Sequence, residues 1–416
     1  MEKKKIKFGL LPRLLIAIIL GILIGEFMPL WFSRTVVTLS GLFSNFLKFV
    51  IPIMICAYVT EGIADLKTGA GKLLIITVAL ACTTTLGFGF GSYLVSYNLF
   101  PHFISSAEIG KIAETTSKTL APYFSMDMPP VMNTISAVIL AFVLGLGISS
   151  LRGKKEIGDT LYNAVHELSA IIDKVLSTVI IPLLPLYICG TFADMTYSGR
   201  TFVVLGILWK VFLCVILMHW SCILIEFTIA GIVSKKNPFV LIKNQLPAYA
   251  TAVGTQSSAA TIPVNLECAK KDGISEQIRN FVVPICASVN MDGSMVTITA
   301  CATAVCLMYQ IPLSAAVVIP FIVTLAIATV ASPGAPGGAI MTALPFLAMI
   351  FGPELGDPNG PVCALMIALY ITQDSFGTAC NISGDNAIGV IVDTIYKKFI
   401  LKDSIISGEK SPTEQQ

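Results

Sequence analysis

Four polar residues stand at helical spacing late in the sequence, within an otherwise apolar stretch. They are Asp374, Thr378, Asn381 and Asp385, spaced i, i+4, i+7 and i+11. On a helix, which turns by about 100° per residue, these side chains fall within roughly 60° of one another and form a polar ladder about 16 Å long. An ionised Asp inside a membrane-spanning helix costs at least ~2.5 kcal/mol, so such residues usually face a cavity on a substrate or ion path. The ladder therefore predicts a binding site, with a pair of buried structural carboxylates as the alternative.

A second polar run interrupts the apolar stretch from 280 to 308. Residues 288–294 read Ser-Val-Asn-Met-Asp-Gly-Ser, and Asn, Asp and Gly together favour an unwound backbone. Unwound backbone exposes carbonyl oxygens, which with the side chains of Asn290 and Asp292 are the hard ligands that sodium prefers. The carboxylate of Asp385 has no Lys or Arg nearby in the sequence, and a bound cation would supply its countercharge. These residues predict a sodium site.

Two more apolar stretches are broken at their midpoints by small or polar residues. The first, 246–266, contains the hydroxyl-rich run 254–263 and is flanked on both sides by Lys and Arg. The second, 312–351, breaks at 331–338, which reads Ala-Ser-Pro-Gly-Ala-Pro-Gly-Gly, and no Lys or Arg flanks it at 309–312 or 352–360. We therefore expect two re-entrant hairpins that enter from opposite sides, which a membrane tolerates where they are buried in protein or line a cavity. A Ser-rich kink within one full span is the alternative for the first.

Composition places the whole chain in a membrane. Of its 416 residues, 55% are hydrophobic and only 12% are charged, and the mean hydropathy is +0.82. A soluble globule of this size would need more polar surface. The net charge of +2 is spread over short clusters and predicts no nucleic-acid partner. The eleven cysteines form no CxxC pair, which argues against a disulfide framework or a transition-metal site.

Hydropathy and charge together predict the topology. Apolar segments of spanning length lie near 9–31, 36–62, 73–100, 129–150, 168–192 and 201–233, and the interrupted segments 280–308 and 361–400 add two more. The first run has no signal-peptide cleavage site and is expected to be a retained span. Lys and Arg clusters alternate between connections, which places both termini in the cytoplasm. The predicted fold is an all-α polytopic membrane protein with eight transmembrane helices and two opposed re-entrant helical hairpins, an inverted-repeat arrangement.

Four motifs in this order resemble the dicarboxylate/amino acid:cation symporter family, which includes glutamate transporters, neutral amino acid exchangers and bacterial serine/threonine symporters. The motifs are Ser-Ser-Ala-Ala-Thr-Ile-Pro at 257–263, Asn-Met-Asp-Gly at 290–293, Gly-Ala-Pro-Gly at 334–337, and the ladder of 374–385. The resemblance implies a glutamate-transporter-like elevator and a homotrimer in the plasma membrane. It divides the chain into residues 1–235, mainly scaffold and trimerisation helices with the third span in the transport domain, a transport domain of 236–402, and a cytoplasmic tail of 403–416.

The resemblance also implies binding residues. For the substrate it implies Gln256, Ser257, Ser258, Ser294, Gly334, Ala335, Asp374, Gly377, Thr378 and Asn381, with Asp374 pairing with the α-ammonium group. For one sodium ion it implies the backbone at Cys286 and Asn381 with the side chains of Asn290 and Asp385. For a second it implies the backbone of Ser288 and Met291 with Thr329, Val330 and Ser332. A third site would use Asp292 with Thr83 or Thr84, although the third span lacks the Tyr that the family places there.

The predicted substrate follows from charge. Family members that carry acidic substrates place an Arg where this chain has Gln256 or Gly377, and without it a second substrate carboxylate would be buried unpaired. We therefore expect sodium-coupled symport of small neutral amino acids, serine and threonine first. Proton coupling, an acidic substrate and an ion channel with re-entrant loops are the alternatives. An enzyme is not expected, because no His lies within these motifs to activate a serine.

Overall fold

The computed structural model describes residues 10–64, 71–104, 120–132, 134–152, 158–199, 201–329, 332, 336–358 and 360–400, and these are helices and their connections without a strand. The first half contains α1 (Leu10–Phe27), α2 (Leu30–Ala64), α3 (Gly71–Leu99), η1 (Phe100–His102), α5 (Thr134–Leu151), α6 (Asp159–Val175), the π-helical segment η2 (Leu176–Ile180), α7 (Ile181–Tyr197) and α8 (Thr201–Ser234). The second half contains α9 (Pro238–Thr255), α10 (Ser258–Lys271), α11 (Glu276–Val289), α12 (Asp292–Met308), α13 (Ala315–Thr329), α14 (Gly338–Ala343), η3 (Leu344–Phe346), α15 (Leu347–Phe351), α16 (Pro361–Ile395) and η4 (Tyr396–Ile400).

Five helical segments in the described part of the chain are long and apolar enough to cross a membrane. They are Leu73–His102, Asp159–Tyr197, Leu205–Ser234, Glu276–Met308 and Val362–Lys398. Two predicted boundaries were wrong. The fifth predicted span, 168–192, lies inside a 39-residue helix, because the π segment η2 joins α6 and α7 without a break. The fourth begins at Thr134 and not at 129, where two consecutive prolines disfavour a helical backbone.

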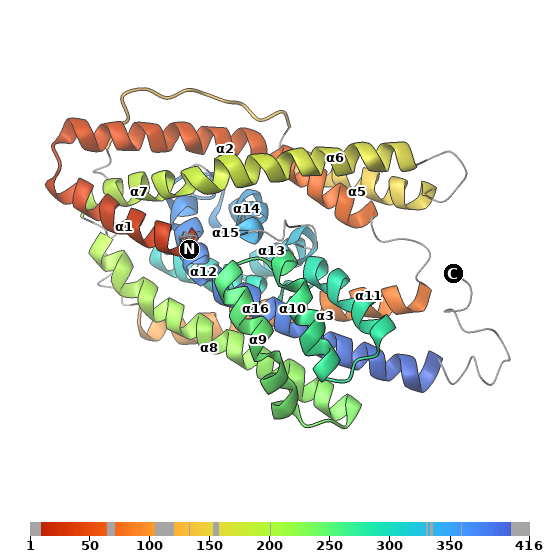
Figure 1. Cartoon of the computed structure of the whole chain (residues 1–416). Helices are drawn as coiled ribbons and strands as arrows, with labels where there is room; N and C mark the ends of the chain where they lie inside the picture. The colour runs from red at the N-terminus through yellow and green to blue at the C-terminus, as the bar shows by residue number, and fades with distance from the viewer. Residues whose placement is uncertain are drawn as a thin grey trace, which may run out of the picture.

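The helices pack in two groups (Figure 1). In the first group, α2 packs against α5, α6 and α7, and α1 packs along α7. A Cβ on Gly21 or Gly25 of α1 would lie 2.5 Å from a carbonyl oxygen of α7, so both glycines permit the close approach. Glycines spaced by four are common at helix contacts inside membranes for this reason.

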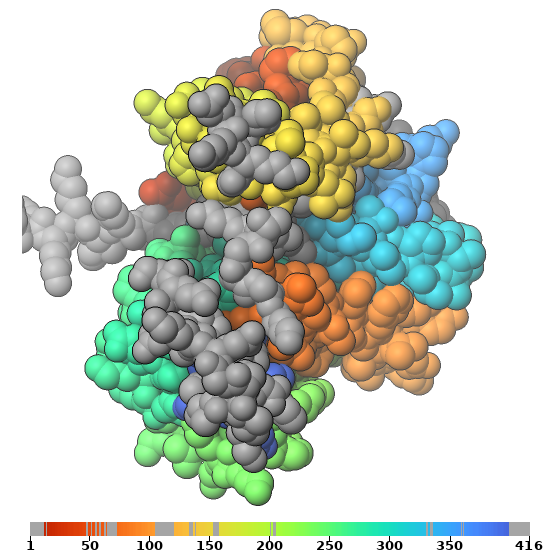
Figure 2. Space-filling view, turned by 90° about the vertical axis from the view of Figure 1, so that its right-hand side faces the viewer, coloured from red at the N-terminus to blue at the C-terminus, as the bar shows by residue number. Residues whose placement is uncertain are grey.

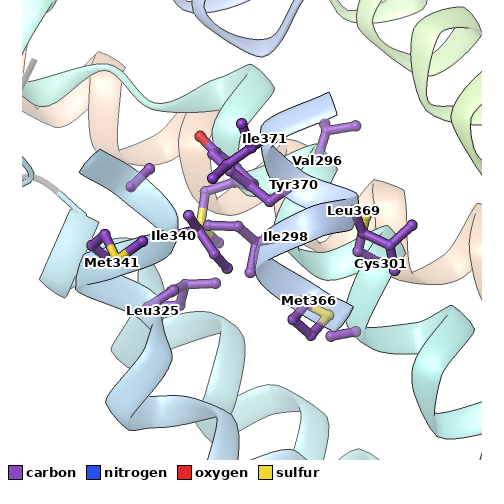
Figure 3. Packing of buried hydrophobic residues seen from close by; sticks show 14 of the residues in the cluster. Val296, Ile298, Cys301, Leu325, Ile340, Met341, Met366, Leu369, Tyr370 and Ile371 are labelled. Atoms are coloured by element: carbon purple, nitrogen blue, oxygen red, sulfur yellow. The ribbon is translucent and has the colours of Figure 1, made fainter. Parts of the chain in front are cut away.

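The second group surrounds α12 and α16. These two helices pack against each other, and α3, α8, α9 and α11 pack around them. The side chains of α12 are buried throughout residues 292–306, and Figure 3 shows apolar side chains of α12, α13, α14 and α16 meeting in one core. In the space-filling view, α3 (orange) lies directly beside α13 (cyan) (Figure 2). The core of this group thus holds the start of α12 and the polar ladder of α16 within an apolar shell.

Two helix-turn-helix units approach the core of this second group. The first is α9 and α10, joined at Gln256, whose φ of 54° is left-handed. The Ser257 side chain caps α10 by accepting from the Ala260 N–H at 3.3 Å. The second unit runs from α13 to α15, and its second arm begins after Gly337, whose φ is 75°. Residues at both tips line the same cavity, described below.

Candidate functional site

The predicted ladder lies on one continuous helix, α16, as its spacing required. Asp374, Thr378 and Asn381 line a buried cavity, and Asp385 lies a turn further along and is fully buried. Residues 362–395 contain no proline, so α16 is continuous and its regular turns bring these side chains to one face. One helix therefore delivers a carboxylate, a hydroxyl and an amide to a single space.

The cavity lies between the two tips, the start of α12 and the ladder. Its lining residues are Gln256, Ser258, Met291, Ser294, Ser332, Ala339, Tyr370, Asp374, Thr378 and Asn381. Its volume of about 20 Å³ is room for one or two water molecules. None of these ten residues is Lys or Arg, and one of them, Asp374, is an acid. A substrate larger than water can enter only if a lining segment moves.

The break before α12 builds the polar floor of the cavity. Asn290 and Met291 leave helical geometry, so the first amides of α12 have no partner within the helix. The Asn381 side-chain oxygen accepts from the N–H of Gly293 at 2.8 Å and from that of Ser294 at 3.2 Å. The Asn381 side-chain amide donates to Ser294 Oγ at 3.0 Å. The break and the ladder therefore hold each other in place.

Tyr370 is a lining residue that sequence reasoning missed. Its hydroxyl donates to Ser294 Oγ at 3.1 Å, and its ring is buried. The residue stands four positions before Asp374, so it extends the ladder by one turn, and this spacing could have identified it.

Each hairpin tip bonds to α16. Gln256 donates through Nε2 to Ser375 Oγ at 2.8 Å, and the Gly337 N–H donates to Asp374 Oδ2 at 2.7 Å. The carboxylate of Asp374 is thus already held by the second tip. Of the other residues predicted at the tips, Ser257 caps α10 and does not line the cavity. Gly334 and Ala335 lie outside the described residues.

Gly377, which the resemblance implies as a substrate-binding residue, is not among the residues that line the cavity. It is buried at the crossing of α16 and α12. A Cβ on Gly377 would lie 3.5 Å from the Gly293 backbone and from Thr297 Oγ1, so its side-chain direction points to α12. Of the two positions where family members with acidic substrates place an Arg, Gln256 and Gly377, only Gln256 is among the residues that line the cavity.

The first predicted sodium set converges on Asn290. The Asn290 side chain donates through Nδ2 to the Asn381 carbonyl oxygen at 3.1 Å and to Asp385 Oδ1 at 3.3 Å. The backbone N–H of Asn290 donates to the Cys286 carbonyl at 2.7 Å. Asp385 Oδ2 is buried and has no hydrogen-bond partner among the described residues. A buried carboxylate oxygen without a partner is costly, and a cation would satisfy it. The chemistry of this set, amide and carboxylate oxygens, fits sodium.

Asp292 and the third helix meet beside this set. Thr85 Oγ1 donates to Asp292 Oδ1 at 3.2 Å, and Thr84 Oγ1 lies 3.4 Å from Asn290 Oδ1. Thr83 instead donates to Ala79 within its own helix and is exposed. The structure therefore places Thr84 and Thr85, and not Thr83, next to Asn290 and Asp292.

The second predicted sodium set is only partly brought together. Ser332 Oγ lies 3.7 Å from Met291 Sδ, and the Ser332 N–H donates to the Thr329 carbonyl at 2.9 Å. The Ser288 side chain is exposed, and the resemblance implies only the backbone of this residue as a ligand. Val330 lies outside the described residues. Within the described chain, no three His, Cys, Asp or Glu side chains are arranged to hold a metal ion.

Two buried residues of α8, His219 and Glu226, also reach the site, and neither belongs to the four sequence motifs. His219 Nε2 bonds to the Gly293 carbonyl at 3.0 Å and lies 2.9 Å from Thr297 Oγ1. Glu226 is 4% exposed and faces Asp292. Their signal in the sequence was the presence of titratable side chains in the middle of the apolar segment 201–233.

Comparison with known proteins identifies the family of this chain. The profile of the family described as "Sodium:dicarboxylate symporter family" matches residues 10–395. The chain is 28% identical over 402 residues to the serine/threonine transporter SstT of Acinetobacter baumannii strain AYE, covering 93% of this chain and 97% of that protein. The SstT proteins of strains ATCC 17978 and SDF show the same identity and coverage. The chain therefore belongs to the sodium:dicarboxylate symporter family, a family of multi-pass membrane transporters and not of enzymes.

Proposed function

We propose that this protein is a sodium-coupled symporter of small neutral amino acids, with serine and threonine as its preferred substrates. The observation that carries the proposal is the charge of the cavity, which offers one carboxylate and no cationic side chain among its ten described lining residues. A neutral amino acid brings one ammonium group, which Asp374 pairs with, and one carboxylate. The Asn381 side-chain amide, which donates to Ser294 Oγ in this structure, and the Thr378 hydroxyl would supply donors for that carboxylate once the amino acid enters.

The polar lining favours a substrate with a hydroxyl group. Gln256, Thr378 and Tyr370 each present a group that could bond to a side-chain hydroxyl. A site built to bond a hydroxyl discriminates against analogues without it, because its own buried polar groups would then be unpaired. The naming of the SstT relatives as serine/threonine transporters supports this choice.

Sodium is the proposed coupling ion. Asp385, Asn290 and the carbonyls of Asn381 and Cys286 would hold one ion, and Met291, Thr329 and Ser332 would contribute to a second. Asp385 of the first set lies one turn after Asn381 on α16, and Asn381 lines the substrate cavity, so Asn381 would belong to both sites. Ion binding that positions Asn381 would raise the affinity for the amino acid, and the reverse follows by linkage.

The transport movement is proposed to be an elevator within a homotrimer embedded in lipid. The group around α12 and α16 would move, and the group of α1, α2, α5, α6 and α7 would stay fixed. We place α8 with the moving group, although a boundary at 235 would leave it in the scaffold, because α8 packs along α16, α9 and α12. The α13–α15 unit would be the outer gate, since its tip holds Asp374 through Gly337.

The test is uptake of radiolabelled serine into proteoliposomes containing the purified chain. A sodium gradient is expected to drive accumulation, and unlabelled threonine is expected to compete at least ~100-fold better than aspartate, since an unpaired buried carboxylate costs several kcal/mol. Uptake driven by a proton gradient without sodium would overturn the choice of ion. Equal competition by aspartate would overturn the choice of substrate, and a current linear in ion concentration would indicate a channel.

A further inference from the structure

Tyr370 is the one aromatic side chain among the ten described residues that line the cavity. It is 1% exposed, and it stands four positions before Asp374 on α16, so the two side chains lie one turn apart on the same face of that helix. Its ring belongs to the apolar core, and Figure 3 shows it within the cluster of buried side chains from α12, α14 and α16. The packing around the ring therefore holds it in place.

The hydroxyl of Tyr370 stands between the two groups proposed to hold the ends of an amino acid. It donates to Ser294 Oγ at 3.1 Å, and the Asn381 side-chain amide donates to the same oxygen at 3.0 Å. It also faces the carboxylate of Asp374. An amino acid with its ammonium group at Asp374 and its carboxylate at Asn381 therefore carries its Cβ atom beside the Ser294–Tyr370 pair.

This pair of hydroxyls offers the cavity one donor and one acceptor. Both lone pairs of Ser294 Oγ are occupied by the donors Tyr370 and Asn381, so the proton of Ser294 remains to be donated. The Tyr370 hydroxyl uses its own proton on Ser294 and keeps a lone pair that can accept. A substrate hydroxyl would satisfy both at once, because it donates and accepts through one oxygen, whereas a methyl group satisfies neither.

The ring of Tyr370 is also the wall of the cavity that is least free to move. Other lining residues, among them Gln256, Ser258 and Ala339, belong to the two tips, and a lining segment must move before a substrate enters a volume of about 20 Å³. Tyr370 instead belongs to α16, and its ring can withdraw only if the buried side chains packed on it move as well. The ring thus sets a limit in its direction whether the tips are open or closed.

We propose that Tyr370 determines which amino acid side chain the cavity accepts. Its hydroxyl, with that of Ser294, bonds the hydroxyl of serine or threonine, and its ring excludes side chains longer than that of threonine. The inference rests on the proposed function and deepens it, because it assigns the choice among neutral substrates to one residue of α16.

The first test measures the binding of serine and alanine by calorimetry at saturating sodium. The wild type should bind serine about tenfold more tightly than alanine, since alanine leaves the two hydroxyls unpaired. Tyr370→Phe keeps the ring and removes the hydroxyl, so serine should bind about tenfold more weakly, alanine should bind no more weakly, and the ratio should approach one. Tyr396→Phe is the matched control and should keep the ratio, because Tyr396 is a buried tyrosine of η4 that does not line the cavity.

The second test concerns the ring. Methionine, which is neutral and unbranched, should bind to Tyr370→Leu but neither to the wild type nor to Tyr370→Phe, because only the leucine variant shortens the wall. The melting temperature and the remaining sodium-dependent binding of serine show that Tyr370→Leu is folded. Methionine binding to the wild type, or its exclusion by the folded leucine variant, would overturn the role of the ring.

A double variant tests whether the two hydroxyls act on the same substrate atom. Ser294→Ala should also lower the ratio of alanine Kd to serine Kd, and the combined variant Ser294→Ala/Tyr370→Phe should lower it by less than the product of the two single effects. A structural role of either residue would change the melting temperature without this coupling. A full product of the two effects would contradict the shared hydroxyl.

The outcomes keep this inference apart from the proposed function. If the wild type binds serine without sodium, or binds aspartate as tightly as threonine, the proposed function fails. If the wild type binds serine with sodium and rejects aspartate, but Tyr370→Phe keeps the wild-type preference for serine over alanine, only this inference is overturned. Equal binding of serine and alanine by the wild type would likewise overturn the role of the Tyr370 hydroxyl alone.

Discussion

At the scale of single residues, the site is a set of carboxylates with separate tasks. Asp374 lines the cavity and is already bonded to the second tip, Asp385 meets Asn290, and Asp292 meets Thr85. Each has at least one neighbour that fixes its position, and Asp385 keeps an oxygen free of partners in the described structure. The position of the unpaired oxygens, more than the number of acids, indicates where a cation would bind.

Replacement of Asp385 by Asn should weaken sodium-dependent serine binding by a factor of 100 or more. A cation left without its buried carboxylate loses roughly 3 kcal/mol. Calorimetry with serine in sodium and in choline buffer measures this, and the wild type should bind only in sodium. Asp393→Asn is the control, because Asp393 lies on the same helix and pairs with Lys397 at 2.6 Å, away from the site. Similar losses in both variants would assign the effect to the helix and not to the ion.

Replacement of Gln256 by Arg should add aspartate to the substrates. Gln256 lines the cavity, so a guanidinium group there can pair with a second substrate carboxylate. Competition of labelled serine by aspartate is the measurement, and Gln256→Met, which adds no charge, is the control. Gly377→Arg is expected to give no such gain, because its side chain would start toward α12. A gain of aspartate binding in Gly377→Arg alone would contradict this placement.

Asp272, at the end of α10 outside the membrane spans, should make stability depend on pH. Burial raises its pKa from 3.8 to about 6, and the bond from Asn244 and the charge of Lys236 only partly oppose this. Because the fold favours the neutral form, its contribution is most favourable below about pH 4 and is lost as pH rises through 6. Asp272→Asn should therefore raise the melting temperature at pH 7 and reduce its change between pH 5 and 7. Parallel melting curves against pH for both proteins would refute the assignment.

At the scale of elements, the crossing of α12 and α16 sets the geometry of the site. A Cβ on Gly293 would lie 2.4 Å from the Gly377 carbonyl oxygen and 2.6 Å from Cys380 Cβ. The two helices can approach this closely because position 293 has no side chain, and the approach brings Asn381 to the amides of Gly293 and Ser294. The contact of two backbones thus creates the floor of the cavity.

Gly293→Ala should separate these helices and abolish serine binding. Overpacking at such a contact costs typically 1–3 kcal/mol, so the melting temperature in detergent should also fall. Gly377→Ala is the matched control from the facing helix, since its Cβ would meet only ordinary contacts at 3.5 Å. Equal behaviour of the two alanine variants would show that the crossing distance does not control the site.

The α13–α15 unit should behave as a gate. Ala339 of this unit and Ser258 of the first tip line the same cavity, so engineered cysteines at both positions are within reach of a short bifunctional thiol reagent. The link should stop serine uptake while the protein keeps its elution volume and melting temperature. Each single-cysteine variant treated with the reagent is the control, and full uptake after complete linking would exclude this unit as the gate.

At the scale of the whole molecule, the arrangement joins an apolar exterior to a polar centre. Large apolar side chains such as Ile19, Leu146 and Ile232 are exposed on the outer helices, where lipid or another subunit would cover them. The polar groups instead converge between the two tips and the α12–α16 crossing. This distribution suits a group of helices that carries an enclosed site through a membrane.

The proposed assembly is testable on the purified protein. Light scattering after subtraction of detergent should give the mass of three chains, and crosslinks should form only between helices of the first group. A monomer that retains sodium-driven serine uptake would show that the trimer is not needed for transport.

The sequence by itself determined the local features of this protein. Helical spacing fixed the ladder on α16, and the polar residues at 288–294 fixed a helix break, because both depend on neighbours within a few turns. Turn-forming and hydroxylated residues likewise marked the two tips. These signals follow from backbone chemistry and periodicity, which act over short distances along the chain.

Only the tertiary structure decided which distant residues meet. The choice of Thr85 over Thr83 depends on the rotation of α3 against α12, and the direction of Gly377 depends on the crossing of α16. Glu226 enters the cluster because α8 packs along α16, a contact across some 160 positions of sequence that no local pattern encodes. Helix rotation and crossing are set by the packing of whole surfaces, so single-residue periodicity could propose the ladder but could not name its partners.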